Sequence, residues 1–168
     1  SALQQMELAY RRVHEFMLNF NPAIAPYPLV NWVTCRLVRY HRQEQLLTEG
    51  DWQLLHEALQ QAEAEAKRQE QMLATFNSAV NQVEVLLAHY LVNAVDHRPS
   101  LASILAGYQQ ALDRGAPPRR IRFVSEHLDV LSIALKGTLF AEAEQALVNQ
   151  LREQLCLREI GNQKNLPY

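Results

Sequence analysis

The feature that most constrains the fold of this chain is a long stretch, from Asp51 to Arg98, that contains neither glycine nor proline. Along it, apolar residues return at alternating steps of three and four, and one position in the series, Gln69, is polar. A solitary helix follows a 3.6-residue period and drifts away from a 3.5-residue repeat. The repeat therefore predicts a helix whose apolar seam is covered by another helix. The seam consists of Trp52, Leu55, Leu59, Ala62, Ala66, Leu73, Phe76, Val80, Val83, Leu87 and Tyr90.

The segments on either side of this stretch predict further helices. Apolar residues at helical spacing predict helices over 3–20 and 29–47, separated by a connector rich in proline. Ser100 is expected to cap a helix over 101–113, which Gly115 ends. The seam itself predicts a stalk roughly 65 Å long at 1.5 Å per residue.

The last part of the chain predicts a change of structure. Residues 119–124 alternate basic and apolar side chains, a pattern typical of a strand. Ser125 is expected to cap a helix that continues to Lys136, and an amphipathic helix is expected over 141–157. The sequence thus predicts a mainly α protein with a long coiled-coil-like helix followed by a small α/β domain. Its parts are an N-terminal helical segment (1–47), the stalk helix (48–98), a helix–strand–helix domain (99–160) and a flexible tail (161–168).

Composition and charge exclude several functions. The net charge of −2 provides no overall field for nucleic acid. No apolar stretch approaches the roughly 20 residues of a membrane span. Two cysteines give neither a disulfide framework nor a metal pattern, which suits the cytoplasm. No phosphate-binding loop is present, and the six histidines lack metal-ligand spacing. We therefore expect no cofactor, no metal and no catalysis.

The C-terminal half resembles a known family in four stretches. They are 94–101, 104–112, Arg120–Val124 and Ser125–Leu128, and the Ala/Glu-rich segment Ala62–Ala66 adds to the likeness. In order they are similar to the end of the stalk, the helix, the basic strand and the Ser-Glu-x-Leu helix of the FliH/SctL group. Those proteins are stators of type III secretion and flagellar export ATPases, similar in turn to rotary-ATPase peripheral stalks. The resemblance covers roughly residues 45 to 155.

This resemblance implies a non-enzymatic stator or adaptor. The stalks of two copies would pair into a homodimer, and the C-terminal domains would clasp a secretion-type ATPase and regulate it. The N-terminal part would reach the ring protein of the cytoplasmic sorting platform, which would place the complex in the cytoplasm, peripheral to the inner membrane. The candidate contacts with an acidic partner are the basic residues Arg114, Arg119, Arg120 and Arg122. A solvated face is the alternative interpretation of those four charges.

Two other hypotheses stay open. In the first, residues 3–47 fold back on the stalk and cover its seam within one chain, which would make the protein a helical-bundle chaperone or adaptor. In the second, an Arg-x4-His spacing serves phosphodiester cleavage, as in helical ribonucleases of the HEPN type. That spacing occurs from Arg36 to His41 and from Arg122 to His127.

Overall fold

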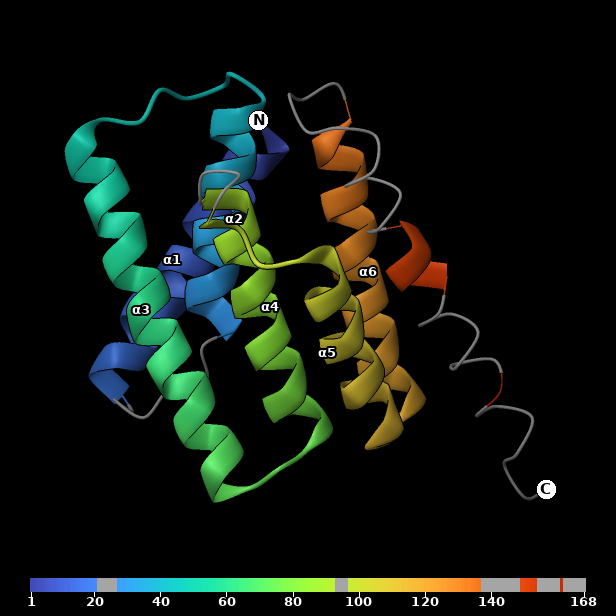
Figure 1. Ribbon diagram of the computed structural model, residues 1–168. Helices are drawn as coiled ribbons and strands as arrows, with labels where there is room; N and C mark the ends of the chain where they lie inside the picture. The colour runs from blue at the N-terminus through green and yellow to red at the C-terminus, as the bar shows by residue number, and fades with distance from the viewer. Residues whose placement is uncertain (21–26, 93–96, 137–148, 154–160, 162–168) are drawn as a thin grey trace.

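The structure, a computed structural model, describes residues 1–20, 27–92, 97–136, 149–153 and 161. Within these ranges the regular structure is helical and contains no strand, so the prediction of a mainly α protein is confirmed. Figure 1 shows the helices gathered into a bundle. The helices are α1 (Ala2–Phe20), α2 (Tyr27–His41), α3 (Glu49–Met72), α4 (Phe76–Val92), α5 (Leu101–Asp113) and α6 (Pro118–Leu135).

The single stalk helix expected over 48–98 is wrong, because the stretch forms two antiparallel helices, α3 and α4 (Figure 1). Helix α3 begins at a capping box between Thr48 and Asp51, and it ends at Leu73, whose backbone is extended. A second reciprocal pair then starts α4. The Thr75 amide donates to Ser78 Oγ at 2.8 Å, and the Ser78 amide donates to Thr75 Oγ1 at 3.2 Å. These bonds satisfy amides that a new helix leaves unpaired, so a turn replaces the continuous rod.

The heptad seam is covered within the chain. Its residues in α3 from Leu55 to Ala66 are buried, as are those in α4 from Phe76 to Tyr90. Trp52 is half-buried, and Leu73 is 70% exposed because it lies in the turn between the two helices. Helices α3 and α4 pack on each other, and α2 packs on both. The N-terminal segment therefore supplies the covering helix, as in the bundle hypothesis.

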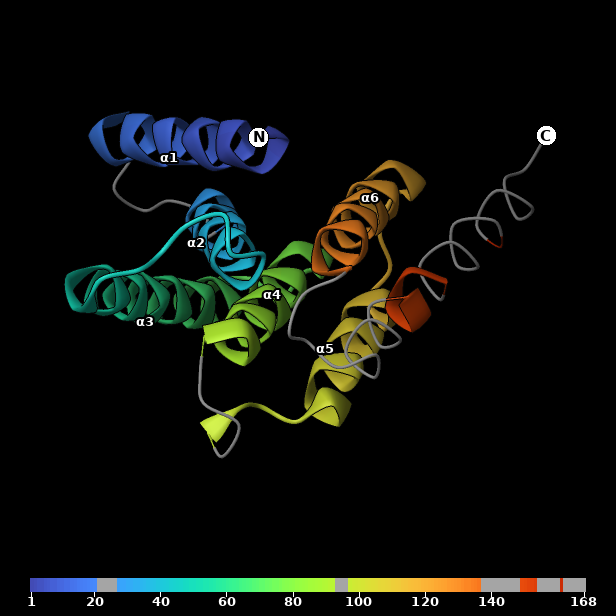
Figure 2. The same ribbon diagram turned by 90° about the horizontal axis from the view of Figure 1, so that it is seen from above.

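Helix α2 is the centre of the bundle. It packs on α1, α3, α4 and α6, and Figure 2 shows it between α1 and α3. A helix surrounded on several sides must be apolar around most of its circumference. That requirement explains the run of buried residues from Pro28 to Cys35, continued by Leu37 and Val38.

The strand expected over 119–124 is wrong, since these residues form the first turns of α6. Pro118 occupies the first turn, where its fixed φ favours a helix and its missing N–H costs nothing. Ile121, Val124 and Leu128 are buried at steps of three and four, which is helical spacing. Ser125 is buried inside α6 and caps no helix. The predicted α/β domain is therefore not formed by the described residues.

The expectation for α5 is confirmed. Ser100 Oγ accepts a hydrogen bond from the Ser103 amide at 3.1 Å, and Gly115 has a φ of 75° just beyond the helix. Of the last helix expected over 141–157, residues 149–153 are described and are helical; the rest lies outside the described residues. The tail expected over 161–168 also lies outside them, except for Gly161.

Helix α5 lies unusually close to α4. A Cβ placed on Gly107 would stand 2.7 Å from Val83 Cγ2, nearer than side chains ever approach. Glycine at this position therefore lets the two helices pack closely and places Tyr108, 1% exposed, in the core. None of the described helices is long and apolar enough to cross a membrane.

Candidate functional site

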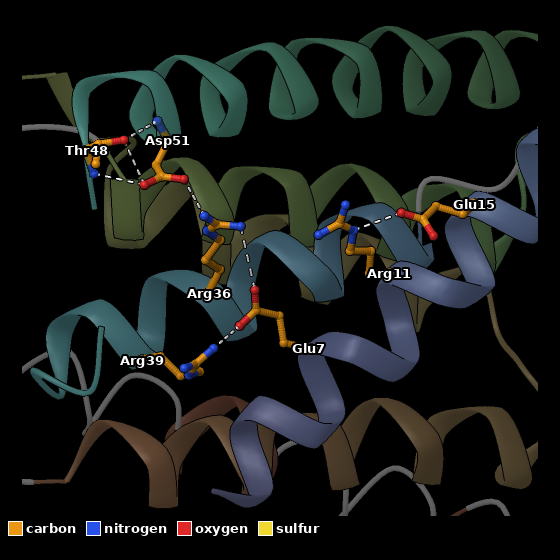
Figure 3. Close-up of polar contacts among 7 residues, drawn as sticks. All are labelled: Glu7, Arg11, Glu15, Arg36, Arg39, Thr48 and Asp51. Atoms are coloured by element: carbon orange, nitrogen blue, oxygen red, sulfur yellow. Dashed lines mark hydrogen bonds and ion pairs between the residues drawn. The ribbon is translucent and has the colours of Figure 1, made fainter. Parts of the chain in front are cut away.

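A network of ion pairs joins α1, α2 and α3, as Figure 3 shows. Arg39 donates to Glu7 at 2.5 Å, and the second oxygen of Glu7 lies 3.8 Å from Arg36. Arg36 also pairs with Asp51, the residue that completes the capping box of α3 with Thr48. Hydrogen bonds from Thr48 and the nearby Arg36 lower the pKa of Asp51. These charges meet opposite charges inside the protein, so we assign them to structure.

The two Arg-x4-His spacings do not form a phosphodiesterase site. Arg36 is engaged in the network above, and His41 Nε2 lies in hydrogen-bond contact with the Leu91 carbonyl at 2.9 Å. Arg122 and His127 both lie on α6, and a separation of five residues places them ~140° apart around the helix. Neither pair brings its two side chains to one exposed face.

The four candidate arginines lie in three different surroundings. Both Nη atoms of Arg114 donate to the Glu70 carboxylate, Nη1 to Oε2 at 2.8 Å. Arg114 Nη1 also donates to the Thr75 carbonyl at 3.0 Å. This contact lowers the pKa of Glu70 and ties the end of α5 to the α3–α4 turn. Arg122 is exposed on α6. Arg119 and Arg120 line a cavity, so they remain candidates for contact with a partner.

That cavity, of about 680 Å³, lies between α4 and α6, and we call it the α4–α6 groove. Phe76 and Val80 line it from α4, and Phe123 and Val124 line it from α6. Its wall is mostly apolar, and a volume of this size is typical of binding sites. Tyr27 and the end of α3 close one side, while the two arginines lie at the first turn of α6. Figure 2 shows α6 on the side of the bundle away from α3.

Glu84 is the exceptional residue of the groove. Its side chain lines the cavity, yet the residue is 2% exposed. Neither of its carboxyl oxygens has a hydrogen-bond partner among the described residues. Burial raises the pKa of this carboxyl to about 8, because the charged form loses its hydration without gaining a counter-charge. Unpartnered buried carboxyls are rare, and strongly shifted groups in a cleft are candidates for function.

The exposed Arg119 and Arg120 line the same cavity, but the other polar groups near Glu84 carry no positive charge at neutral pH. The Tyr108 hydroxyl is buried and has no hydrogen-bond partner in the described part of the chain. The Tyr27 ring packs edge-on against the Tyr10 ring of α1, with the ring centroids 6.1 Å apart. Burial lowers the pKa of His127 to about 4, so its ring is neutral at pH 7. Glu84 therefore faces aromatic and neutral polar groups.

The heptad pattern does not indicate Glu84, because this residue lies off the seam. One signal could have found it, since α4 contains no other acidic residue and neither lysine nor arginine. A lone carboxylate in a helix that apolar neighbours cover must find a partner, change its protonation or serve a function.

Metal chemistry has no support in the part of the chain that the structure describes, where no three His, Cys, Asp or Glu side chains are placed to share an ion. Comparisons with protein families, with curated proteins and with solved structures find no match to this chain. The resemblance to export-ATPase stators therefore stays a prediction, and the candidate site has to be argued from its own geometry.

Proposed function

We propose that this protein is a non-enzymatic helical-bundle adaptor or chaperone that binds an apolar segment of a partner protein in the α4–α6 groove. The observation that carries the proposal is the groove itself, an apolar cavity between two helices with an exposed aromatic side chain, Phe123, at its edge. Binding a helical or extended segment in such a groove is a common mode of peptide recognition. The paired state of Arg36 and the contact of His41 with Leu91 favour binding over catalysis.

A protein segment suits this surface because its apolar contacts extend beyond one cavity. Val130 and Ile133 of α6 are exposed, and they lie within ~80° of Phe123 around the helix. Both line a second cavity of about 260 Å³, which Leu3 and Met6 of α1 also line. Phe123 and Ile133 are separated by ~15 Å along α6 at 1.5 Å per residue. Exposed apolar surface of this extent is typical of interaction sites.

The positive charges of Arg119 and Arg120 would orient a bound segment in the groove. Arg119 and Arg120 are exposed at the first turn of α6, and Arg119 lies 5.7 Å above the Phe123 ring. Acidic residues near one end of the segment would meet these guanidinium groups. The ATPase and ring-protein partners remain predictions of the stator hypothesis, whose rod the described residues do not form. Our proposal requires neither of them.

The test compares two exposed phenylalanines in pull-downs from the native cell. Phe123→Glu places a charge at the groove, whereas Phe16→Glu places one on α1, where Phe16 is 64% exposed and lines neither cavity. We expect Phe16→Glu to retain the proteins that the unaltered chain captures and Phe123→Glu to lose at least one of them. Identical captures from all three chains would overturn the proposal.

A further inference from the structure

We propose that the segment bound in the α4–α6 groove carries a lysine or arginine whose cation pairs with Glu84. This inference rests on the proposed function, and it names the group that determines which segments bind. It begins from the one acidic side chain among the described lining residues of the groove, whose carboxyl oxygens have no hydrogen-bond partner there.

Burial of the Glu84 carboxyl without a hydrogen-bond partner among the described residues has an energetic cost. A carboxyl taken out of water without a hydrogen bond destabilises the folded chain, and an ionised one does so more strongly. The described lysines and arginines do not offset this cost. Arg119 and Arg120 are exposed at the first turn of α6, and Arg114 is paired with Glu70. A cation delivered by a partner would restore pairing in a site already shielded from water.

The lining of the groove suits the shape of a lysine or arginine side chain. Lysine and arginine have long apolar stems with a charge at the end. Phe76, Val80 and Val124 can pack against such a stem, and Glu84 lines the same cavity. An acidic head group would instead meet a carboxyl, and a fully apolar side chain would leave it unpaired. The lining therefore favours a basic residue flanked by apolar ones.

Binding should release a proton. At pH 7 the empty carboxyl is mostly protonated, because burial raises the pKa of Glu84 to about 8. Pairing with a cation favours the ionised form, so affinity should rise by up to about tenfold per pH unit below that pKa and level off above it. Titratable and charged groups of α1, α2, α5 and α6 lie near Glu84 or line the same cavity. They are Tyr10, Tyr27, Tyr108, Arg119, Arg120 and His127.

None of these neighbours titrates in the same range. The pKa values of the three tyrosines are raised above 10 by burial, so their hydroxyls stay neutral. His127, whose pKa is lowered to about 4, is neutral from pH 6 upward. A proton released between pH 6 and pH 8 would therefore report on Glu84.

The experiment selects peptides from a random display library on the full chain and on two variants. Peptides retained by the full chain and lost on Phe123→Glu define binders of the groove. We expect these binders to be enriched in one lysine or arginine among apolar residues, and we expect that enrichment to vanish on Glu84→Gln. Groove binders without a basic residue would overturn this inference and leave the proposed function standing. If no peptide depended on Phe123, the proposed function would fail as well.

A selected peptide then gives a quantitative check. Replacing its basic residue by norleucine should weaken binding to the unaltered chain at least about tenfold and leave binding to Glu84→Gln unchanged. Calorimetry in two buffers of different ionisation enthalpy should detect close to one proton released at pH 7, and none with Glu84→Gln. Hexylammonium serves as a probe for a free amine. If it bound as tightly as the selected peptides, a small organic cation would be the occupant and our inference would be wrong.

Discussion

Two acidic residues withdrawn from water illustrate opposite uses of a buried charge. The Glu7 side chain is 9% exposed and lies between Arg36 and Arg39. Glu84 is 2% exposed and meets no cation among the described residues. The first carboxylate holds three helices together, because its partners extend to Asp51 of α3. The second contributes no contact that would justify its burial.

This difference shows where to look for a functional site in this chain. Burial of a charge does not by itself indicate a site, since paired buried charges are common structural elements. The informative observation is a buried charge that lacks a partner and borders a cavity. Glu84 meets both conditions, and Glu7 meets neither.

The largest expected effect on stability comes from removing the helices that carry the ion pairs of Glu7. Deleting residues 1–47 removes α2, the helix on which α1, α3, α4 and α6 all pack. We expect the remaining chain to lose cooperative thermal unfolding, followed by circular dichroism. Deleting residues 1–20 removes α1, which among the described helices packs mainly on α2, and should lower the melting temperature while preserving cooperativity. A chain from residue 48 that still melts sharply would support a self-sufficient stalk dimer.

The next largest effect is the pH dependence of stability that Glu84 causes. The pKa of Glu84 is about 8 in the folded chain and near 4.5 when unfolded, so between these values the unfolded state binds fewer protons. Stability should therefore fall as pH rises through this window, by about 1.4 kcal/mol per unit from this group, and then level off. Glu84→Met removes the group and should be the more stable chain at pH 8.

Urea unfolding of both chains at pH 5, 6, 7 and 8 measures this effect. The difference between the two free energies of unfolding isolates Glu84, because the opposing titration of His127, whose pKa is lowered to about 4, is common to both chains. A difference that stayed constant with pH would show that Glu84 has a partner or access to water.

A third, smaller loss of stability should follow from breaking the ion pairs of Glu7. Glu7→Ala leaves Arg39 without its closest partner and should reduce the free energy of unfolding by roughly 3 kcal/mol. The matched control is Glu15→Ala, which breaks an exposed pair with Arg11 at 2.8 Å on the same helix and should change stability by less than about 0.5 kcal/mol. Equal effects of the two substitutions would remove the contrast between Glu7 and Glu84.

The smallest effect distinguishes the arginines. Arg114→Ala removes the tie between α5 and the α3–α4 turn and should cost about 1 kcal/mol, since the pair is partly exposed to solvent. Arg120→Ala, at the groove, should leave stability unchanged and weaken binding of the acidic end of a selected peptide. Chemical denaturation and fluorescence anisotropy measure the two results. A destabilising Arg120→Ala would assign that residue to structure.

Much of the helical fold could be predicted from local sequence. Periodicity and proline placement located α1 and the start of α2, which ends at His41 and not at Leu47, and Ser100 with Gly115 located α5. The turn between α3 and α4 could not be predicted from the heptad pattern, because Leu73 keeps the phase of the seam although it is exposed. The turn depends on the reciprocal bonds of Thr75 and Ser78, which an alternating count of apolar residues does not include.

The site was harder to predict than the fold. A six-residue window at 119–124 alternates like a strand, and the helical spacing of Ile121, Val124 and Leu128 emerges over a longer window. Without α6 as a helix there is no groove, and without the groove Glu84 is one more residue of a long helix. Its isolation depends on packing between segments distant in sequence, which periodicity does not contain.

The close approach of Gly107 to Val83 has a consequence for how this protein can vary. Any larger residue at position 107 would displace α5 from α4, because its Cβ would meet Val83 Cγ2 at 2.7 Å. The next residue, Tyr108, would then move away from its place near Glu84. Random mutagenesis under selection for folding should therefore recover glycine at 107, or a larger residue only together with a smaller one at 83.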